Sequence, residues 1–165
     1  MKNTRNPNGR NSAFQHPFFT SKANHKKDFF CSLHESLLKS LAYQDLSPQA
    51  KTLYTYCTLQ VYLEEPKPLK GNNYSFTMNK DKAEKYGLIK HSGQGQLYKW
   101  INSLIEHGFI DCFESGKNTC TKSIYTFSER WKTWKPGTPP PYKAMTTSLI
   151  KKYRGMEEKK NANET

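Results

Sequence analysis

Six polar residues between positions 90 and 102 have side chains suited to contacts with nucleic acid. Lys90 is a candidate for contact with the phosphate backbone, with solvated charge as its alternative, and the candidates for the bases are Ser92, Gln94, Gln96, Lys99 and Asn102. Glutamine and asparagine amides can form two hydrogen bonds with adenine, a lysine can bind guanine, and a serine can bind a base edge or a phosphate. This short segment therefore offers the chemistry that distinguishes one base sequence from another.

Apolar residues at helical spacing separate these polar positions and predict a helix over about 94–107. The apolar series is Leu97, Trp100, Ile101, Leu104 and Ile105, and it stops before Gly108. Such a helix buries one face and leaves the polar side chains on the other, where glycines at 93 and 95 would let a phosphate approach the backbone. Every surface helix also needs a polar face, so a merely solvated face stays open as an alternative.

A β-hairpin is predicted immediately after this helix. Its strands run over 109–113 and 119–127, and the polar tip at 114–118 contains the glycine that such turns favour. Side chains suited to phosphate or minor-groove contact gather here, namely Ser115, Lys117, Asn118, Thr119 and Lys122. A soluble turn that binds nothing remains the alternative for this tip.

The elements that precede this helix follow from their own start signals. Ser32 and Glu35 have the spacing of a capping box, and Ser47 before Pro48 is a second helix start. Thr77 is placed to cap a third helix. The predicted elements are helices at about 33–43, 48–63 and 78–86 and a short strand at 73–76. Together with the hairpin they predict a mainly α-helical α+β fold.

The order of these elements, with two short helices joined by a tight turn and followed by a hairpin, resembles the winged helix-turn-helix superfamily. The segment Lys99–Ile110 (KWINSLIEHGFI) is similar to the recognition helix and first wing strand of that superfamily. Segments 46–54 and 76–87 resemble helix starts in the winged-helix domains of plasmid and mobile-element replication initiators from low-GC Gram-positive bacteria. The resemblance covers about residues 29–134.

This resemblance implies a way of binding DNA. The helix at 94–107 would enter the major groove with its N-terminal part against the base edges. The wing, over 113–122, would contact the backbone or the minor groove. Lysines at 80, 82 and 85 on the preceding helix add further candidates for backbone contact.

The formal charge of +12 on the 165-residue chain is unevenly distributed. Residues 1–27 carry six basic and no acidic side chains, residues 28–112 carry nine of each, and residues 135–165 carry seven basic and three acidic ones. We therefore expect a flexible basic arm over 1–27, a winged-helix body over 28–134 and a basic tail over 135–165. The arm would lie in a minor groove or merely keep the protein soluble.

The tail has two predicted parts. Three consecutive prolines at 139–141 predict an extended linker. A short helix is expected at about 144–154, with fraying from Glu157 onward. Its apolar side would consist of Met145, Leu149, Ile150 and Tyr153.

Membrane and secreted classes do not fit the sequence. No run approaches the ~18 apolar residues of a membrane helix, and no apolar segment follows the N-terminal residues to form a secretory signal. The four cysteines are scattered without a CxxC pair, which indicates reduced thiols and a cytoplasmic location.

Catalytic and metal chemistry also lack support. His107, Cys112 and Cys120 have neither the paired spacing nor the fourth ligand of a zinc site. Asp45 with Glu65 and Lys67 mimics a nuclease pattern that arises easily by chance, and no phosphate-binding loop of an NTPase is present. We therefore expect no catalytic residue, no metal and no cofactor, and a protein that is not an enzyme.

The leading hypothesis is sequence-specific binding of double-stranded DNA at a plasmid or mobile-element origin, in replication or conjugative transfer. A promoter-bound transcriptional regulator of the same type is the first alternative. A protein-docking module that uses the tail is the second, and a nuclease the third. The sequence leaves open whether the protein forms a homodimer and whether replication or relaxosome proteins are partners, and it predicts no membrane partner.

Overall fold

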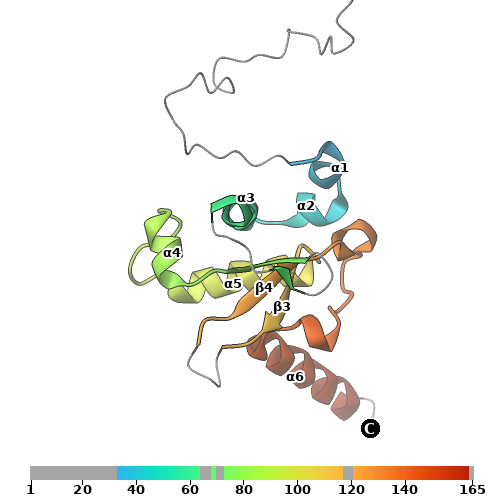
Figure 1. Ribbon diagram of the computed structural model, residues 1–165. Coiled ribbons are helices and arrows are strands. Elements are labelled where there is room, and N and C mark those ends of the chain that lie inside the picture. Colours follow the sequence, from blue (N-terminus) through green and yellow to red (C-terminus); the bar gives the residue numbers. More distant parts are fainter. Residues whose placement is uncertain (1–32, 64–67, 70–72, 117–120, 164–165) are drawn as a thin grey trace, which may run out of the picture. The chain divides into compact units, whose positions relative to one another are not determined.

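The structure, a computed structural model, describes residues 33–63, 68–69, 73–116 and 121–163, which all lie in the unit Cys31–Thr165. It is a mixed α+β fold, mostly helical, with a small antiparallel sheet (Figure 1). The predicted fold class is confirmed at this level. The arm at 1–27 lies outside the described residues.

Six helices, four strands and two 3₁₀ turns make up the described elements. In chain order they are α1 (Glu35–Leu38), α2 (Leu41–Asp45), α3 (Pro48–Leu63), β1 (Pro68–Leu69), β2 (Asn73–Thr77), α4 (Lys80–Lys85), α5 (Gln94–Glu106), β3 (Ile110–Glu114), β4 (Ile124–Phe127), η2 (Arg130–Thr133), η3 (Tyr142–Ala144) and α6 (Thr147–Asn163).

The helix predicted at 33–43 is wrong, because the chain forms two short helices there. Ser40 separates them: its hydroxyl donates to the carbonyl of Leu37 at 2.7 Å and accepts from the backbone N–H of Tyr43 at 3.2 Å. This side chain therefore ends one helix and caps the next. The following start is as predicted, since Ser47 Oγ accepts from the N–H of Ala50 at 3.3 Å and α3 begins at Pro48.

The cap predicted for the helix at 78–86 is also wrong. Asn79 caps α4, because its Oδ1 accepts from the backbone N–H of Lys82 at 3.1 Å. Thr77 is the last residue of β2 and pairs with Ile124 of β4. The sheet therefore captures the predicted cap, and the helix begins two residues later than expected.

The sheet has the strand order β1-β2-β4-β3, all antiparallel. β4 is central to the three longer strands: it pairs with β3 in the hairpin and with β2, which comes before α4 and α5 in the chain. A register shift between Cys112 and Glu114 bends the hairpin near its tip. The two helices are thus inserted between strands that lie side by side, and this fixes α5 against the sheet.

The core lies between α3, α5 and the sheet. It includes Ala50, Leu53, Leu97, Ile101, Leu104, Ile105, Phe109, Ile110 and Tyr125, each at most 1% exposed. The ring of Phe109 packs edge-on to Tyr54 with centroids 5.1 Å apart and lies parallel to Trp131 at 6.1 Å. The apolar side of α5 predicted from its spacing is therefore the centre of the core.

The C-terminal segment packs on the body. α6 begins at Thr147 and continues to Asn163, so the fraying predicted from Glu157 is wrong for the residues that are described. Leu149 is 2% exposed. Lys152 Nζ and the hydroxyl of Tyr153 both contact Glu106 Oε1 on α5, at 2.6 and 3.0 Å. In Figure 1, α3 and α6 lie on opposite sides of α5 and the hairpin.

No helix among the described ranges is long and apolar enough to cross a membrane.

Candidate nucleic-acid interface

The turn between α4 and α5 is built on two glycines. Gly87 has a φ of +68° and ends α4 in a Schellman motif, with N–H bonds from Gly87 to Glu84 and from Leu88 to Ala83, both at 2.9 Å. Gly93 then donates to the carbonyl of Lys90 at 2.8 Å and accepts from the first N–H groups of α5. The chain therefore reverses within a few residues and presents the start of α5 to solvent.

The predicted DNA-contacting residues at this start are exposed together. Lys90 and Ser92 lie in the turn, and Gln94, Gln96 and Lys99 lie on the first turns of α5, all in the exposed class. Leu97 and Ile101, which alternate with them, are at most 1% exposed. The structure thus gathers five of the six side chains on one accessible stretch, as the periodicity predicts.

Tyr98 belongs to the same surface, although the sequence prediction missed it. It is 43% exposed, while most aromatic side chains of the described ranges are packed in or against the core. It lies one helical turn from Gln94 and Gly95 and one turn before Asn102. Helical spacing could have indicated it, because Tyr98 lies outside the apolar series of the helix.

The two glycines expected to admit a phosphate differ. A Cβ on Gly93 would lie 2.8 Å from Ile89 Cβ, so packing within the turn explains this glycine. Gly95 has nothing within 4 Å of the place a Cβ would occupy, and it sits in a helix, where glycine costs up to about 1 kcal/mol relative to alanine. Only Gly95 keeps the open backbone that a ligand could approach.

Asn102 is not free for base contact. Its amide nitrogen donates to Ser148 Oγ at 3.0 Å, and its Oδ1 accepts from Thr146 Oγ1 at 2.8 Å. Both partners belong to the start of the C-terminal segment. The residue was placed correctly on the outer face of α5, but the tail covers that face from Asn102 onward, which no local pattern indicates.

The wing is described only in part. Lys122 is exposed, and Ser115 Oγ lies 3.1 Å from Thr147 Oγ1 of α6. Lys117, Asn118 and Thr119 lie outside the described residues. The tip end of the hairpin therefore contacts the tail.

The lysines of α4 point in different directions. Lys82 Nζ donates to Gln60 Oε1 at 2.8 Å and to Thr77 Oγ1 at 2.9 Å. This ammonium therefore joins α4 to α3 and β2 and is already engaged within the protein. Lys80 lies 3.6 Å from Glu84, and Lys85 is exposed. Of the three, Lys85 has the most accessible cation.

The other chemical candidates are weak. Asp45 Oδ2 lies 2.9 Å from His107 Nε2, whose ring stacks on Trp134, while Glu65 and Lys67 of the nuclease-like pattern lie outside the described ranges. Within the part of the chain that the structure describes, no three His, Cys, Asp or Glu side chains are grouped to hold a metal. Burial raises the pKa of the Cys112 thiol to about 11, which opposes nucleophilic chemistry there.

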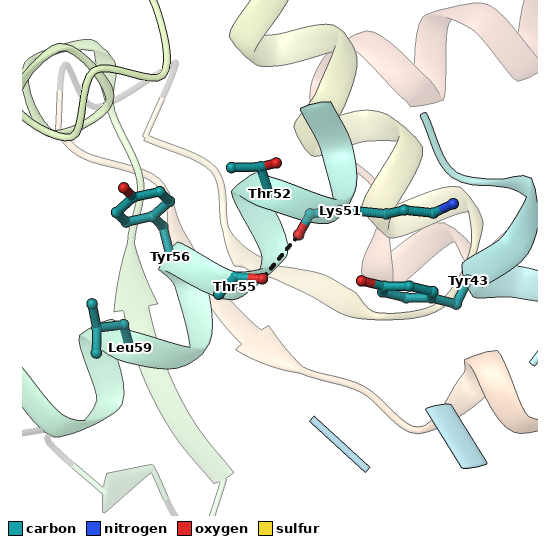
Figure 2. A pocket seen from close by; sticks show the side chains of 6 residues that line it. All are labelled: Tyr43, Lys51, Thr52, Thr55, Tyr56 and Leu59. Atoms are coloured by element: carbon teal, nitrogen blue, oxygen red, sulfur yellow. Dashed lines mark hydrogen bonds between the residues drawn. The ribbon is translucent and has the colours of Figure 1, made fainter. Parts of the chain in front are cut away.

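A hollow of about 420 Å³ lies along α3, and Figure 2 shows the side chains around it. It is lined by Tyr43, Lys51, Thr52, Thr55, Tyr56 and Leu59. Thr52 and Thr55 donate to the α3 carbonyls of Pro48 and Lys51, at 3.0 and 3.2 Å, and the Lys51 ammonium lies 5.2 Å from the centre of the Tyr43 ring. Because both threonine hydrogens go to backbone carbonyls of α3 and Lys51 donates to the carbonyl of Gln44, this hollow presents few donors to a ligand.

Comparisons of the chain with protein-family models, with curated proteins and with solved structures find no match. A functional assignment therefore depends on the arrangement of the side chains themselves.

Proposed function

We propose that this chain binds double-stranded DNA in a sequence-specific way through a winged helix-turn-helix. The observation that carries the proposal is the order α3, β2, α4, α5, β3, β4, with β4 paired to both β2 and β3 and the polar start of α5 exposed beside the hairpin. In helix-turn-helix docking the second helix enters the major groove with its N-terminal residues at the base edges. α5 has the side chains for that role.

The side chains divide into two groups by their chemistry. Gln94, Gln96 and Lys99 would contact base edges, and Tyr98 would contact a thymine methyl group or a sugar. Lys90, Ser92 and Lys122 would bind phosphates and so fix the position of the protein on the duplex. In this proposal the protein needs no cofactor and is not an enzyme.

The biological setting that we propose is a plasmid or mobile-element origin in the cytoplasm, where the protein would assist replication or conjugative transfer. This setting depends on the resemblance of the segments at 46–54 and 76–87 to replication initiators. A promoter-bound regulator would use the same interface, so only the location of the bound sites on the element distinguishes the two roles.

Selection of duplexes from a random library by the full chain tests the proposal. We expect a shared sequence to be enriched, and we expect Gln96→Ala and Lys99→Ala to relax the preference at one or two positions, with a cost of about 1–3 kcal/mol each. Gln49→Ala, at an exposed position on α3, is the matched control. If no duplex is preferred, the protein does not recognise a DNA sequence.

A protein-docking module is the second candidate, because the tail already occupies the second half of the outer face of α5. In that role the chain would capture a protein partner while duplexes of every sequence bind equally weakly. The same library selection, repeated alongside a pull-down with the full chain, separates the two functions.

A further inference from the structure

A second cavity of about 420 Å³ opens where α5, the tip end of the hairpin and the start of α6 meet. Its lining comes from segments far apart in the sequence: 78–79, 98, 115–116, 121–123, 125 and 146–148. The start of α6 is not among the residues expected to contact DNA. The cavity therefore joins the proposed DNA-binding helix and wing to a third element.

The lining is mixed, with Met78 and the rings of Tyr98 and Tyr125 as apolar walls and hydroxyl groups between them. Six of the twelve residues carry an aliphatic hydroxyl, and Lys122 and Asn79 add an ammonium and an amide. No aspartate or glutamate is among them, although the chain has 14 acidic residues. The hydroxyl residues are Ser115, Thr121, Ser123, Thr146, Thr147 and Ser148. Hydroxyls, amides and lysines without a nearby carboxylate are the groups that proteins direct at phosphate oxygens.

The hydrogen bonds around the cavity leave donors for a ligand. Ser115 Oγ and Thr147 Oγ1 lie 3.1 Å apart, and their mutual bond uses only one of their two hydroxyl hydrogens. Thr146 donates its hydrogen to Asn102, and Asn102 in turn donates to Ser148. These bonds hold the hydroxyls in place while the second hydrogen of the Ser115–Thr147 pair remains available.

The position of the cavity identifies the source of the phosphate. Tyr98 of α5 forms one wall and Lys122 of the wing forms another. A duplex that lies along the start of α5 and touches the wing must carry its backbone across this opening, because the two elements flank it.

We propose that this cavity binds one phosphodiester of the DNA backbone, which makes the start of α6 part of the interface. The inference rests on the proposed function, and it gives Asn102 a positioning role: the amide holds Thr146 and Ser148 at the cavity and does not contact a base. The tail then contributes to DNA binding and does not have to move away from α5 before DNA can bind.

Duplexes with single neutral methylphosphonates test this directly. Full-length wild type, Thr147→Val and Lys122→Gln are titrated with the selected duplex and with a series in which one phosphate at a time is neutral. We expect wild type to lose about fivefold or more in affinity at one phosphate. Both variants should bind the unmodified duplex more weakly than wild type by a similar factor. Neutralising that one phosphate should lower their affinity no further, while neutralising a phosphate at another contact should still lower it.

Salt dependence provides a second measurement. The slope of log K against log salt concentration should fall by about one for Lys122→Gln and stay unchanged for Thr147→Val, because a hydroxyl displaces no counterion. Thr138→Val and Lys39→Gln, at exposed positions outside the cavity lining, are matched controls that should bind like wild type. Ser115→Ala approaches the same hydroxyl pair from the wing if Thr147→Val fails to fold.

Three outcomes would overturn the proposal. The variants could bind the duplex as tightly as wild type does. Their losses of affinity could add to the methylphosphonate losses at every phosphate position. Inorganic phosphate could occupy the cavity without changing the affinity for the duplex. In each of these cases duplex recognition by α5 survives. If wild type prefers no duplex, the proposed function itself fails, and the phosphodiester proposal fails with it.

Discussion

Two glycines that end helices in the same way have different surroundings. Gly87 and Gly108 both have positive φ, +68° and +78°, and both close Schellman motifs. A Cβ on Gly87 would meet nothing within 4 Å, whereas one on Gly108 would lie 2.7 Å from Arg130 Cβ and from the backbone nitrogen of Trp131. The first glycine is required by its backbone conformation alone, and the second by conformation and by packing.

Alanine substitutions should separate these two requirements. We expect Gly87→Ala to lower the free energy of unfolding by about 1–2 kcal/mol, the cost of a left-handed alanine. Gly108→Ala should lose that amount and about 1–3 kcal/mol more, because η2 must move. Urea unfolding followed by circular dichroism measures both. Equal losses would mean that η2 does not hold its place against the end of α5.

The two described thiols, Cys57 and Cys112, predict a loss of stability in alkali. Burial raises the pKa of Cys112 to about 11, with a contribution from Asp111, and burial raises the pKa of Cys57 well above its usual range. Above about pH 9 the unfolded chain releases thiol protons that the folded chain keeps. The unfolded state then binds fewer protons, so the free energy of unfolding falls as pH rises.

We expect a decrease of about 3 kcal/mol in the unfolding free energy between pH 8 and pH 10 from the two thiols together. Urea unfolding at the two pH values measures it. The Cys57→Ala/Cys112→Ala double variant is the control: it should be less stable at pH 8 but should lose much less on going to pH 10. The same decrease in wild type and double variant would assign the pH effect to other groups.

At the scale of elements, α5 contains a position where stability and binding should change in opposite directions. Gly95 lies in the exposed first turn, and a methyl group there would meet nothing in the free protein. Gly95→Ala should therefore raise the free energy of unfolding by up to about 1 kcal/mol. If the DNA backbone approaches this turn, the same methyl group should weaken duplex binding.

Thermal unfolding and duplex titration of Gly95→Ala check both halves of this prediction. A variant that is more stable and binds DNA less tightly supports close approach of the backbone. Unchanged duplex affinity would show that the glycine has no part in the interface. Gln49→Ala, at an exposed position on α3, controls for a general effect of helix stabilisation.

The elements predicted correctly are those with a strong local period. α3, α5 and the first strand of the hairpin follow from apolar spacing, with Pro48 at the start of α3 and Gly108 after the end of α5. The second strand, predicted over 119–127, begins only at Ile124, because residues 121–123 form no strand. The errors arise where one polar side chain could take either of two structural roles, as a helix cap or as a residue inside a helix or strand. Ser40 forms a cap inside a stretch with helical spacing, and Thr77 joins a strand whose partner, β4, lies some 47 residues later at Ile124.

The candidate site was predicted in part for the same reason. The exposed series from Lys90 to Lys99 depends only on the period of α5. The bonds of Asn102 to Thr146 and Ser148 join residues 44 and 46 positions apart, and the cavity beside them needs six separate segments. Contacts over such distances have no signature in a single sequence, because they depend on how the finished elements pack.

At the scale of the whole molecule, the proposed DNA binding would draw on different parts of the chain for charge and for base contacts. The segment 28–112, which contains α5, has nine basic and nine acidic residues, while 1–27 carries six basic residues and none that is acidic. Among the basic residues of the tail, Lys152 is already paired with Glu106. Attraction to phosphates must therefore come mainly from the segments that flank the neutral part, and selectivity from the start of α5.

This separation predicts that the arm sets affinity and salt dependence without setting sequence preference. The arm has six basic residues, Lys2, Arg5, Arg10, Lys22, Lys26 and Lys27. Replacing all six by glutamine should lower the slope of log K against log salt by up to about 5, since each neutralised phosphate contributes about 0.9. The ratio of affinities for the selected and a scrambled duplex should stay within about threefold of the wild-type ratio, because phosphate contacts carry no base information.

Titrations from 50 mM to 300 mM salt measure both the slope and the affinity ratio. Lys99→Ala is the reciprocal control, since it should reduce the ratio while changing the slope by about one or less. An arm variant that keeps the slope of wild type would show that the positive charge of residues 1–27 only keeps the protein soluble, and a variant that loses the ratio would place base recognition in the arm.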